Sequence, residues 1–414
     1  MRCYIVHYLP NRIINKVIVS FKLFELRSTT KFRPLFFAVT AGISVASTYY
    51  LQPIYGSVAS AFHVSASNVS VGTAITQIGY ALGLIFLVPL GDMVNRRRLI
   101  TAMMILAGVA LALTSASVNL TMLFASAFMI GITGVVTQMT IGLVASLAPD
   151  GDRASAVSVA MSGLLAGVLL ARTVSGITAL YLGWRFLFAI AAVAMVVLAL
   201  FAVKRIPSNI VAPNLSYGEL LASLVTTLKS SHSLRVACSL GFFQFMTFSI
   251  FWNTSALWLG QHFHLNSLQI GLVALVGLAG TLSSRLAGSL SDRGYRFYVS
   301  WVGIALVALS YLLLAVGKGS LILFIAAAIV LDFGVQGSHL ANQAAIYAVM
   351  PESRSRVTGV YMTSYFAGGS IGSVISTLFY THFGYGSIPW LGFIAASLGL
   401  AIRSVFRREA ISAR

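Results

Sequence analysis

Two ionisable residues lie deep inside long apolar stretches of the chain. Asp332 is near the middle of the run 320–349, and Arg172 is well inside the run 154–181. An ionised Asp at the centre of a bilayer costs roughly 2.5–3.5 kcal/mol on insertion scales, so such a residue usually faces a cavity or a partner. A carboxyl group in that position can gain and lose a proton, which is the chemistry that proton-coupled transport requires.

Further polar residues share the helix face of Asp332. Gln336 follows at i+4, His339 at i+7 and Gln343 one turn later, which predicts a polar stripe along one helix. A structural Asp that is satisfied by a neighbouring helix is the alternative. Arg172 is expected either to pair with Asp332 or to bind an anionic part of a solute.

The composition places the chain among membrane proteins. Hydrophobic residues make up 58% of it, charged residues 9%, and the mean hydropathy is +0.90, whereas soluble domains carry about 25% charged residues. The net charge of +18 does not indicate nucleic-acid binding, because the bases are scattered between apolar runs. No zinc-like Cys/His spacing, nucleotide loop or nucleophile elbow is evident, so we expect neither a cofactor nor an enzyme.

The apolar runs predict an all-α membrane fold with twelve spanning helices. About 20 apolar residues cross the hydrocarbon core, and the runs are 35–57, 69–90, 98–117, 120–147, 154–181, 186–203, 236–259, 268–289, 297–316, 320–349, 356–380 and 387–405.

A polar interruption divides these runs six and six. The resulting plan is a basic segment 1–33, a six-helix bundle 34–203, a linker 204–235 with a short surface helix at 217–228, a second bundle 236–406 and a tail 407–414. Segment 1–33 is either an amphipathic helix on the membrane surface or a poorly ordered basic extension, and we favour the extension.

The distribution of basic residues predicts the orientation. Of the 27 Lys and Arg residues, 23 lie on the side that holds both termini and the linker, and the opposite loops hold Arg185 and Lys318. Cytoplasmic loops are enriched in Lys and Arg. Both termini are therefore expected in the cytoplasm.

A charged loop recurs at half the chain length. The stretch 88–99 carries Asp92, Arg96 and Arg97, and 200 positions later Asp292 is followed by Arg293. Further matches between the halves fall at offsets of 200 to 202. This repeat predicts two six-helix bundles related by a pseudo-two-fold axis along the membrane normal, with a solute site between them near the midplane.

These residues carry a resemblance to the major facilitator superfamily over about residues 34–408. Its loop signature Gly-x-Leu-x-Asp-Arg-x-Gly-Arg-Arg is matched at Leu90, Asp92, Arg96 and Arg97, and departs at Val88, Met93 and Asn95. The second copy keeps Gly288, Leu290, Asp292 and Arg293. The stretches 49–53 and 331–336 resemble bacterial proton-linked efflux members, which implies a location in a bacterial inner membrane. The resemblance implies that the charged loops latch the cytoplasmic side in the outward-facing state. Alternatively, their charges only fix the topology.

The resemblance also implies which spans line the cavity, namely the first, fourth, seventh and tenth. Their polar and aromatic candidates are Tyr50, Gln52, Gln138, Gln244, Trp252, Asn253, Asp332, Gln336 and His339. A few polar groups among aromatics are typical of a small-molecule site, although any single Gln or Trp can equally serve helix packing.

Three functions follow as hypotheses. The first is a monomeric, proton-coupled exporter of a small organic solute. The second is a proton-coupled importer of an anionic solute, and the third is a non-transporting membrane sensor or relic. The export motif of the family expects Gly-Pro and then a Gly pair in span five, where this chain has Gly167-Val168 and Ala171-Arg172, which weakens the case for export.

Overall fold

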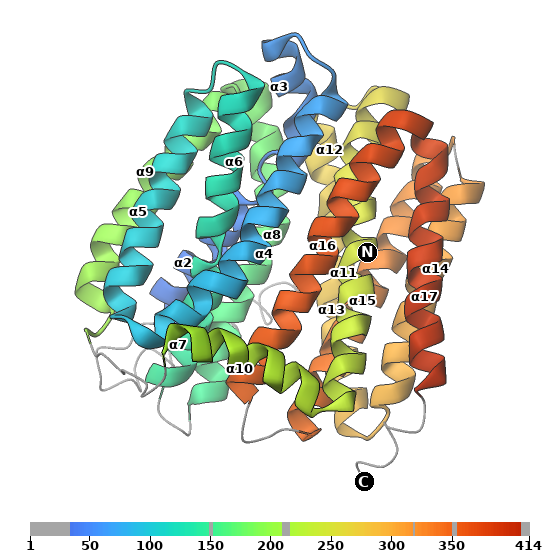
Figure 1. Ribbon diagram of the computed structural model, residues 1–414. Helices are drawn as coiled ribbons and strands as arrows, with labels where there is room; N and C mark the ends of the chain where they lie inside the picture. Colours follow the sequence, from blue (N-terminus) through green and yellow to red (C-terminus); the bar gives the residue numbers. More distant parts are fainter. Residues whose placement is uncertain (1–33, 149–151, 209–215, 318, 350–353, 407–414) are drawn as a thin grey trace, which may run out of the picture.

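The structure is a computed structural model, and it describes residues 34–148, 152–208, 216–317, 319–349 and 354–406 (Figure 1). Within these ranges the chain is helical and contains no strand. The segments 1–33 and 407–414, for which we expected a basic extension and a tail, lie outside the described residues.

Nine helical elements form the N-terminal half, which we define as residues 34–205. They are α2 (Pro34–Ser47), η1 (Gln52–Ile54), α3 (Tyr55–Phe62), α4 (Ala66–Met93), α5 (Arg96–Ser115), α6 (Leu120–Gly134), α7 (Val136–Leu147), α8 (Arg153–Tyr181) and α9 (Trp184–Arg205). Side chains that precede three of these helices accept a backbone N–H of the first turn, as N-caps do. These caps are Ser65 of α4, Asn95 of α5 and Asn119 of α6.

The linker helix and the C-terminal half follow. They comprise α10 (Tyr217–Ser230), α11 (His232–His262), α12 (Ser267–Val273), η2 (Ala274–Gly277), α13 (Leu278–Asp292), α14 (Arg296–Val316), α15 (Leu321–Val349), α16 (Arg354–Phe383), η4 (Tyr385–Ser387) and α17 (Ile388–Val405). We call residues 232–405 the C-terminal half. The end of the molecule that carries α10 is the linker end, and the opposite end, with α3 and α12, is the distal end (Figure 1).

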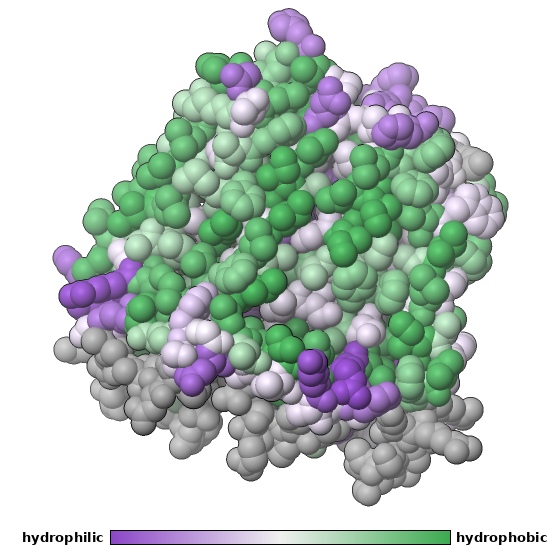
Figure 2. Space-filling view, viewed as in Figure 1, coloured by the Kyte–Doolittle hydropathy of each residue, from purple (hydrophilic) through white to green (hydrophobic). Residues whose placement is uncertain are grey.

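Apolar side chains cover the outside of the bundle. Val193, Leu200 and Ile394 are more than half exposed, and Figure 2 shows an apolar band with hydrophilic residues toward both ends. Within the described residues, eleven helical segments are long and apolar enough to cross a membrane. An apolar surface of this extent suits a lipid environment rather than water, and the predicted all-α membrane fold is confirmed.

The remaining expected span, 356–380, coincides with α16, which is long enough but less apolar. Its 30 residues include many Ser, Thr, Gly and Tyr. The helix packs against α11 of its own half and against α4 of the other half. A helix that packs against helices on two sides exposes less surface to lipid, so it needs fewer apolar residues.

The two halves repeat one pattern of helix pairing. In the N-terminal half α2 packs on α8, α4 on α6 and α5 on α9. In the C-terminal half α11 packs on α16, α13 on α15 and α14 on α17. Glycines spaced by four allow the first pair of each half to approach closely, as small residues do in membrane helices. Gly163 and Gly167 of α8 lie on the backbone of α2, and Gly368 and Gly372 of α16 lie on the backbone of α11.

Helix α10 crosses the linker end between the halves (Figure 1). It starts with a capping box, in which Ser216 N–H donates to the Glu219 carboxylate at 2.6 Å and Glu219 N–H donates to Ser216 Oγ at 3.3 Å. The hydrogen bond from the Ser216 backbone N–H, together with an interaction between the Ser216 side chain and the carboxylate, holds the pKa of Glu219 below its ordinary value. The Tyr217 hydroxyl donates to the Phe86 carbonyl at 2.7 Å, which fastens α10 to α4.

Candidate functional site

Arg172 of α8 lies at the junction of the two halves and is 4% exposed. Its Nε donates to Gln52 Oε1 at 2.8 Å. The guanidinium carbon is 4.9 Å from the ring centroid of Tyr49 and 4.7 Å from that of Trp252. Arginine stacks favourably on aromatic faces, and the attraction is strongest where water is excluded. One amino group, Nη2, is buried and makes no hydrogen bond.

Asp332 of α15 is held by the same tryptophan, at the N–H edge of its ring. The Trp252 indole N–H donates to Asp332 Oδ1 at 3.0 Å, and both side chains are buried. The other carboxylate oxygen, Oδ2, lies against Gly277, where a Cβ atom would approach it to 2.7 Å. The absence of a side chain at residue 277 therefore makes room for the carboxylate.

The two buried charges are thus linked through Trp252. The hydrogen bond of Arg172 goes to Gln52, and the hydrogen bond of Asp332 comes from Trp252. Each charge still lies within the electrostatic field of the other. Of the predicted site residues, the structure brings together Gln52, Arg172, Trp252 and Asp332, which we call the central cluster.

The polar stripe on α15 runs from this cluster toward the linker end. Gln336 packs against Gly280 of α13. His339 Nδ1 is 3.0 Å from the Tyr361 hydroxyl, and its ring lies 4.5 Å from that of Tyr365, both on α16. Asp332 and His339 therefore share a helix face but have separate partners.

Tyr50 is not part of the central cluster. Its ring packs edge-on against Phe188 at 6.1 Å, and it lines an apolar groove between α2 and α8. The preceding residue, Tyr49, faces Arg172 instead. Both tyrosines lie in the turn between α2 and η1, where helical periodicity does not determine which side chain points inward.

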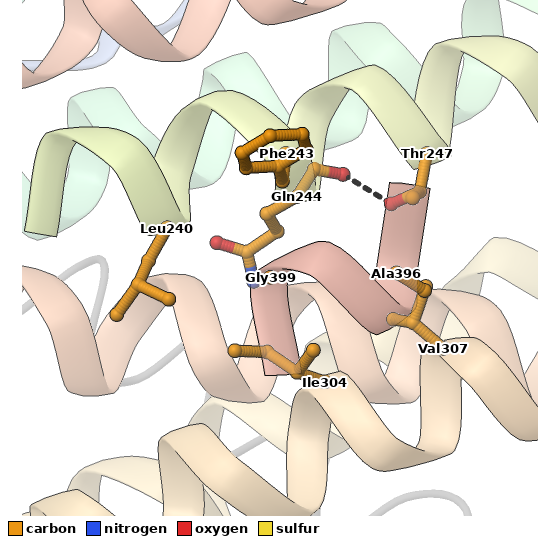
Figure 3. A pocket seen from close by; sticks show the side chains of 8 residues that line it. All are labelled: Leu240, Phe243, Gln244, Thr247, Ile304, Val307, Ala396 and Gly399. Carbon is orange, nitrogen blue, oxygen red and sulfur yellow. Dashed lines mark hydrogen bonds between the residues drawn. The ribbon is translucent and has the colours of Figure 1, made fainter. Parts of the chain in front are cut away.

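Gln244 lies inside the C-terminal half rather than between the halves. Its Nε2 donates to the Val335 carbonyl at 2.6 Å and also to Ser338 Oγ, which ties α11 to α15. It lines a small cavity of about 10 Å³ (Figure 3). The residues around that cavity are Leu240, Phe243, Gln244, Thr247, Ile304, Val307, Ala396 and Gly399. This geometry fits a role in helix packing, the alternative reading of a lone Gln.

Gln138 of α7 is half-buried and lies near Tyr80 of α4. The Tyr80 ring in turn packs on Phe366 of α16, with 4.3 Å between centroids. Gln138 is therefore near a contact between the halves but has no described contact with the central cluster.

Asn253 of α11 forms a separate polar network. Its Oδ1 accepts a 2.9 Å hydrogen bond from the Tyr55 hydroxyl of α3, and that hydroxyl is 2.7 Å from Thr73 Oγ1 of α4. Its Nδ2 donates to the Ser373 carbonyl and to the hydroxyls of Ser376 and Thr377 on α16, and the distances range from 2.9 to 3.2 Å. Neither Tyr55 nor Thr73 was among the predicted residues.

Further bonds between the halves lie toward the distal end. Ser57 Oγ is 3.0 Å from Ser267 Oγ, and Thr173 Oγ1 donates to the Gly271 carbonyl at 2.9 Å. With the Tyr55–Asn253 bond, they join α3 and α8 to α11 and α12. Ser370 Oγ of α16 also donates to the Gln77 carbonyl of α4 at 2.8 Å, midway along both helices. Of the described hydrogen bonds between the halves, three therefore lie toward the distal end.

The charged loops also repeat in their contacts. Arg96 Nε donates to the Gly91 carbonyl at 3.1 Å, and Arg296 Nε donates to the Ser291 carbonyl at 3.3 Å. Both arginines begin a helix and reach back five residues, at an offset of 200. Arg296, rather than Arg293, is the structural counterpart of Arg96.

The contacts of the other described residues in these loops do not follow the repeat. Arg97 Nη1 donates to the Val203 carbonyl at 3.5 Å, and Arg293 is exposed at the end of α13. Asn95, a departure from the family signature, caps α5. The side chains of Asp92 and Asp292 lie outside what the structure describes.

Comparisons with known proteins agree with this architecture. A sequence profile of the Major Facilitator Superfamily matches residues 37–235 and 237–413. The putative uncharacterized transporter YgaY of Escherichia coli K12 is 39% identical over 376 residues, which cover 90% of this chain and 95% of that protein. A probable transporter of Streptomyces coelicolor is 32% identical over 362 residues, with 86% and 83% covered.

Two solved structures share the fold. A bacterial homologue of the human lysosomal transporter Spinster, in an inward-facing and unoccupied conformation, superposes with a TM-score of 0.72 at 14% identity, over 92% of this chain and 96% of that one. The human organic anion transporter MFSD10 gives a TM-score of 0.64 at 15% identity, with 89% and 98% covered. The chain belongs to the major facilitator superfamily of membrane transporters, which are not enzymes and need no resident cofactor.

Proposed function

We propose that this protein is a proton-coupled secondary transporter that moves a small organic solute out of the cell by alternating access. The observation that carries the proposal is Asp332, a buried acid at the junction of two halves that must move relative to one another. A carboxyl group in such a place can load a proton from one side and release it to the other. We infer that Asp332 is the proton-carrying group.

The distribution of contacts between the halves supports alternating access. Hydrogen bonds such as Tyr55–Asn253 and Ser57–Ser267 close the distal end. By the positive-inside rule, the linker end with its basic residues faces the cytoplasm. In this orientation the structure corresponds to a state closed toward the outside, and we infer a monomer in the inner membrane with both termini inside.

A specific observation favours the second candidate, an importer of an anionic solute. Arg172 Nη2 is buried without a hydrogen-bond partner. A buried guanidinium group with an open donor can bind a carboxylate of the cargo once the halves separate. Uptake of an aromatic carboxylate by intact cells, lost in Arg172→Ala, would support this function over export.

Transport in inside-out vesicles tests the proposed export. A proton gradient should drive uptake of at least one member of a panel that contains a lipophilic cation, a neutral aromatic and an aromatic carboxylate. Asp332→Asn should abolish gradient-driven uptake and leave exchange of the same solute down its own gradient. Asp152→Asn, which changes an exposed acid at the linker end, is the matched control and should behave like wild type.

Two results would overturn the proposal. Gradient-driven uptake that is unchanged in Asp332→Asn would exclude Asp332 as the proton-carrying group. Folded protein without measurable flux of any panel member would favour the non-transporting sensor or relic.

A further inference from the structure

The Trp252 indole contacts a charged group from each half of the protein. Its ring face lies 4.7 Å from the guanidinium carbon of Arg172, which belongs to the N-terminal half. Its N–H donates to Asp332, which like Trp252 belongs to the C-terminal half. Any rocking of one half against the other must therefore act on the contact between Trp252 and Arg172.

The two contacts of Trp252 respond differently to a proton on Asp332. Indole is a donor only, and its hydrogen bond to an ionised carboxylate is roughly twice as strong as one to a neutral acid. The attraction between the ring face and Arg172 depends on how the ring is turned rather than on the acid itself. The protonation state of Asp332 thus controls how firmly the ring is held against Arg172.

We propose that Trp252 is a positioning residue that conveys the protonation of Asp332 to Arg172 in the opposite half. With Asp332 ionised, the hydrogen bond holds the indole flat on Arg172, and the two halves stay joined at this level. With Asp332 protonated, the bond weakens, the indole turns away, and the halves separate more easily at the distal end. This inference rests on the proposed proton coupling through Asp332.

Among the described residues around Asp332, Arg172 is the charged group that a change in the protonation of Asp332 can affect. Trp252 of α11 donates to the carboxylate of Asp332, and Gly277 of η2 lies against it. Tyr365 of α16 interacts electrostatically with the same carboxylate. Tyr49 lies near Arg172. On α15 itself, His339 shares a hydrogen bond with the Tyr361 hydroxyl. Direct attraction between Arg172 and Asp332 is the competing explanation of any pH response, because it also weakens when the acid is protonated.

Distances between spin labels can separate these explanations without a known cargo. One label pair replaces Ala61 and Thr381 at the distal end, and the other replaces Ala102 and Tyr298 toward the linker end, all exposed positions. The full chain is used with Cys3→Ser and Cys238→Ala, in lipid nanodiscs, across a pH series. Each variant is first checked for a wild-type melting temperature.

The variants separate the two interactions of Trp252, the hydrogen bond from its N–H and the contact of its ring face. Trp252→Phe keeps a ring face but has no N–H, and Trp252→Gln keeps an N–H donor but has no ring. Trp390→Phe, at a tryptophan that is 54% exposed, is the matched control. Asp332→Asn fixes the acid in an uncharged form.

We expect the ratio of distal-open to distal-closed protein to rise about tenfold as the wild type is acidified, within the usual range of coupling between sites. Trp252→Phe and Trp252→Gln should both lose most of this response. Asp332→Asn should not respond to pH, and adding Trp252→Phe to it should change nothing further. Trp390→Phe should respond like wild type.

A wild-type pH response in Trp252→Phe would overturn the inference, because direct attraction between Arg172 and Asp332 would then suffice. In that case proton-driven transport and the proposed function still stand. If neither the distances nor solute flux in the wild type respond to protons, the proposed function itself fails.

Discussion

The Tyr55 hydroxyl donates a 2.9 Å hydrogen bond to Oδ1 of Asn253, and this bond joins a helix of the N-terminal half to a helix of the C-terminal half. Both side chains are buried, Tyr55 at 2% and Asn253 at 0% exposure. The sequence suggests Asn253 as a residue that binds the solute. Its hydrogen bonds instead run to Tyr55 and to α16, which makes it a connection between the halves.

Tyr55→Phe should weaken the closed distal end. It removes the hydroxyl and leaves the buried Oδ1 of Asn253 without its donor, at a cost of about 1–3 kcal/mol to this state. A cysteine placed at Ser57 should therefore react faster with a membrane-impermeant thiol reagent than in the wild-type background. Tyr298→Phe, at an exposed tyrosine, is the control. Unchanged reactivity in Tyr55→Phe would show that this bond does not hold the distal end closed.

Gly167→Ala should destabilise the protein, because the added methyl group would meet the backbone of Gly42 on α2. Overpacking of this kind costs about 1–3 kcal/mol, and we expect a lower melting temperature in detergent. Gly142→Ala is the matched control, since no atom lies within 4 Å of its added methyl group. In the control, the better helix propensity of Ala should leave stability unchanged or improve it by about 0.5–1 kcal/mol. Equal melting temperatures for both variants would contradict the close approach of α2 and α8.

Gln244→Leu should leave solute specificity unchanged and should alter stability only slightly. The substitution leaves the Val335 carbonyl and the Ser338 hydroxyl without the Gln244 donor, and it also removes the buried Oε1 that has no partner. The two effects oppose one another, so a change of about 1 kcal/mol or less in unfolding free energy is expected. The ranking of a panel of transported solutes should stay as in wild type. A changed ranking would show that Gln244 contributes to solute binding after all.

Acidification should loosen the first turn of α10. The folded-state pKa of Glu219 lies below its ordinary value because Ser216 donates hydrogen bonds to the ionised carboxylate. The stabilisation is therefore present above the ordinary pKa and is lost as the pH falls through the lowered one. The protection of the amides at 217–220 against hydrogen exchange, measured relative to the intrinsic exchange rate at each pH, should fall over that range. In Glu219→Gln the exchange should be faster at neutral pH and should lack this pH step. A step that persists in Glu219→Gln would have to come from another group.

Much of the fold follows from the sequence alone. Twenty apolar residues in a row require a spanning helix, because backbone groups in lipid must be satisfied within the segment. The repeat of Asp92 at Asp292 predicts two equivalent halves, and the helix pairing of α2 on α8 and of α11 on α16 repeats in the structure. The burial of Asp332 and Arg172 was also predictable, since both lie far from the ends of their apolar runs.

The tertiary structure alone decided the partners of these residues. Tyr49, which stacks on Arg172, and Tyr50, which packs on Phe188, are neighbours in the turn between α2 and η1, and only the fold decides which of the two faces the cluster. The expected choice for Arg172 was between Asp332 and a solute, yet its closest described contacts are Gln52, Tyr49 and Trp252, and Trp252 also donates to Asp332. Asn253 and Trp252 are neighbours on α11, but the first binds Tyr55 and the second binds Asp332. Such contacts depend on how helices from distant parts of the chain are rotated and shifted against one another, and hydropathy and spacing along one chain carry no information on that rotation.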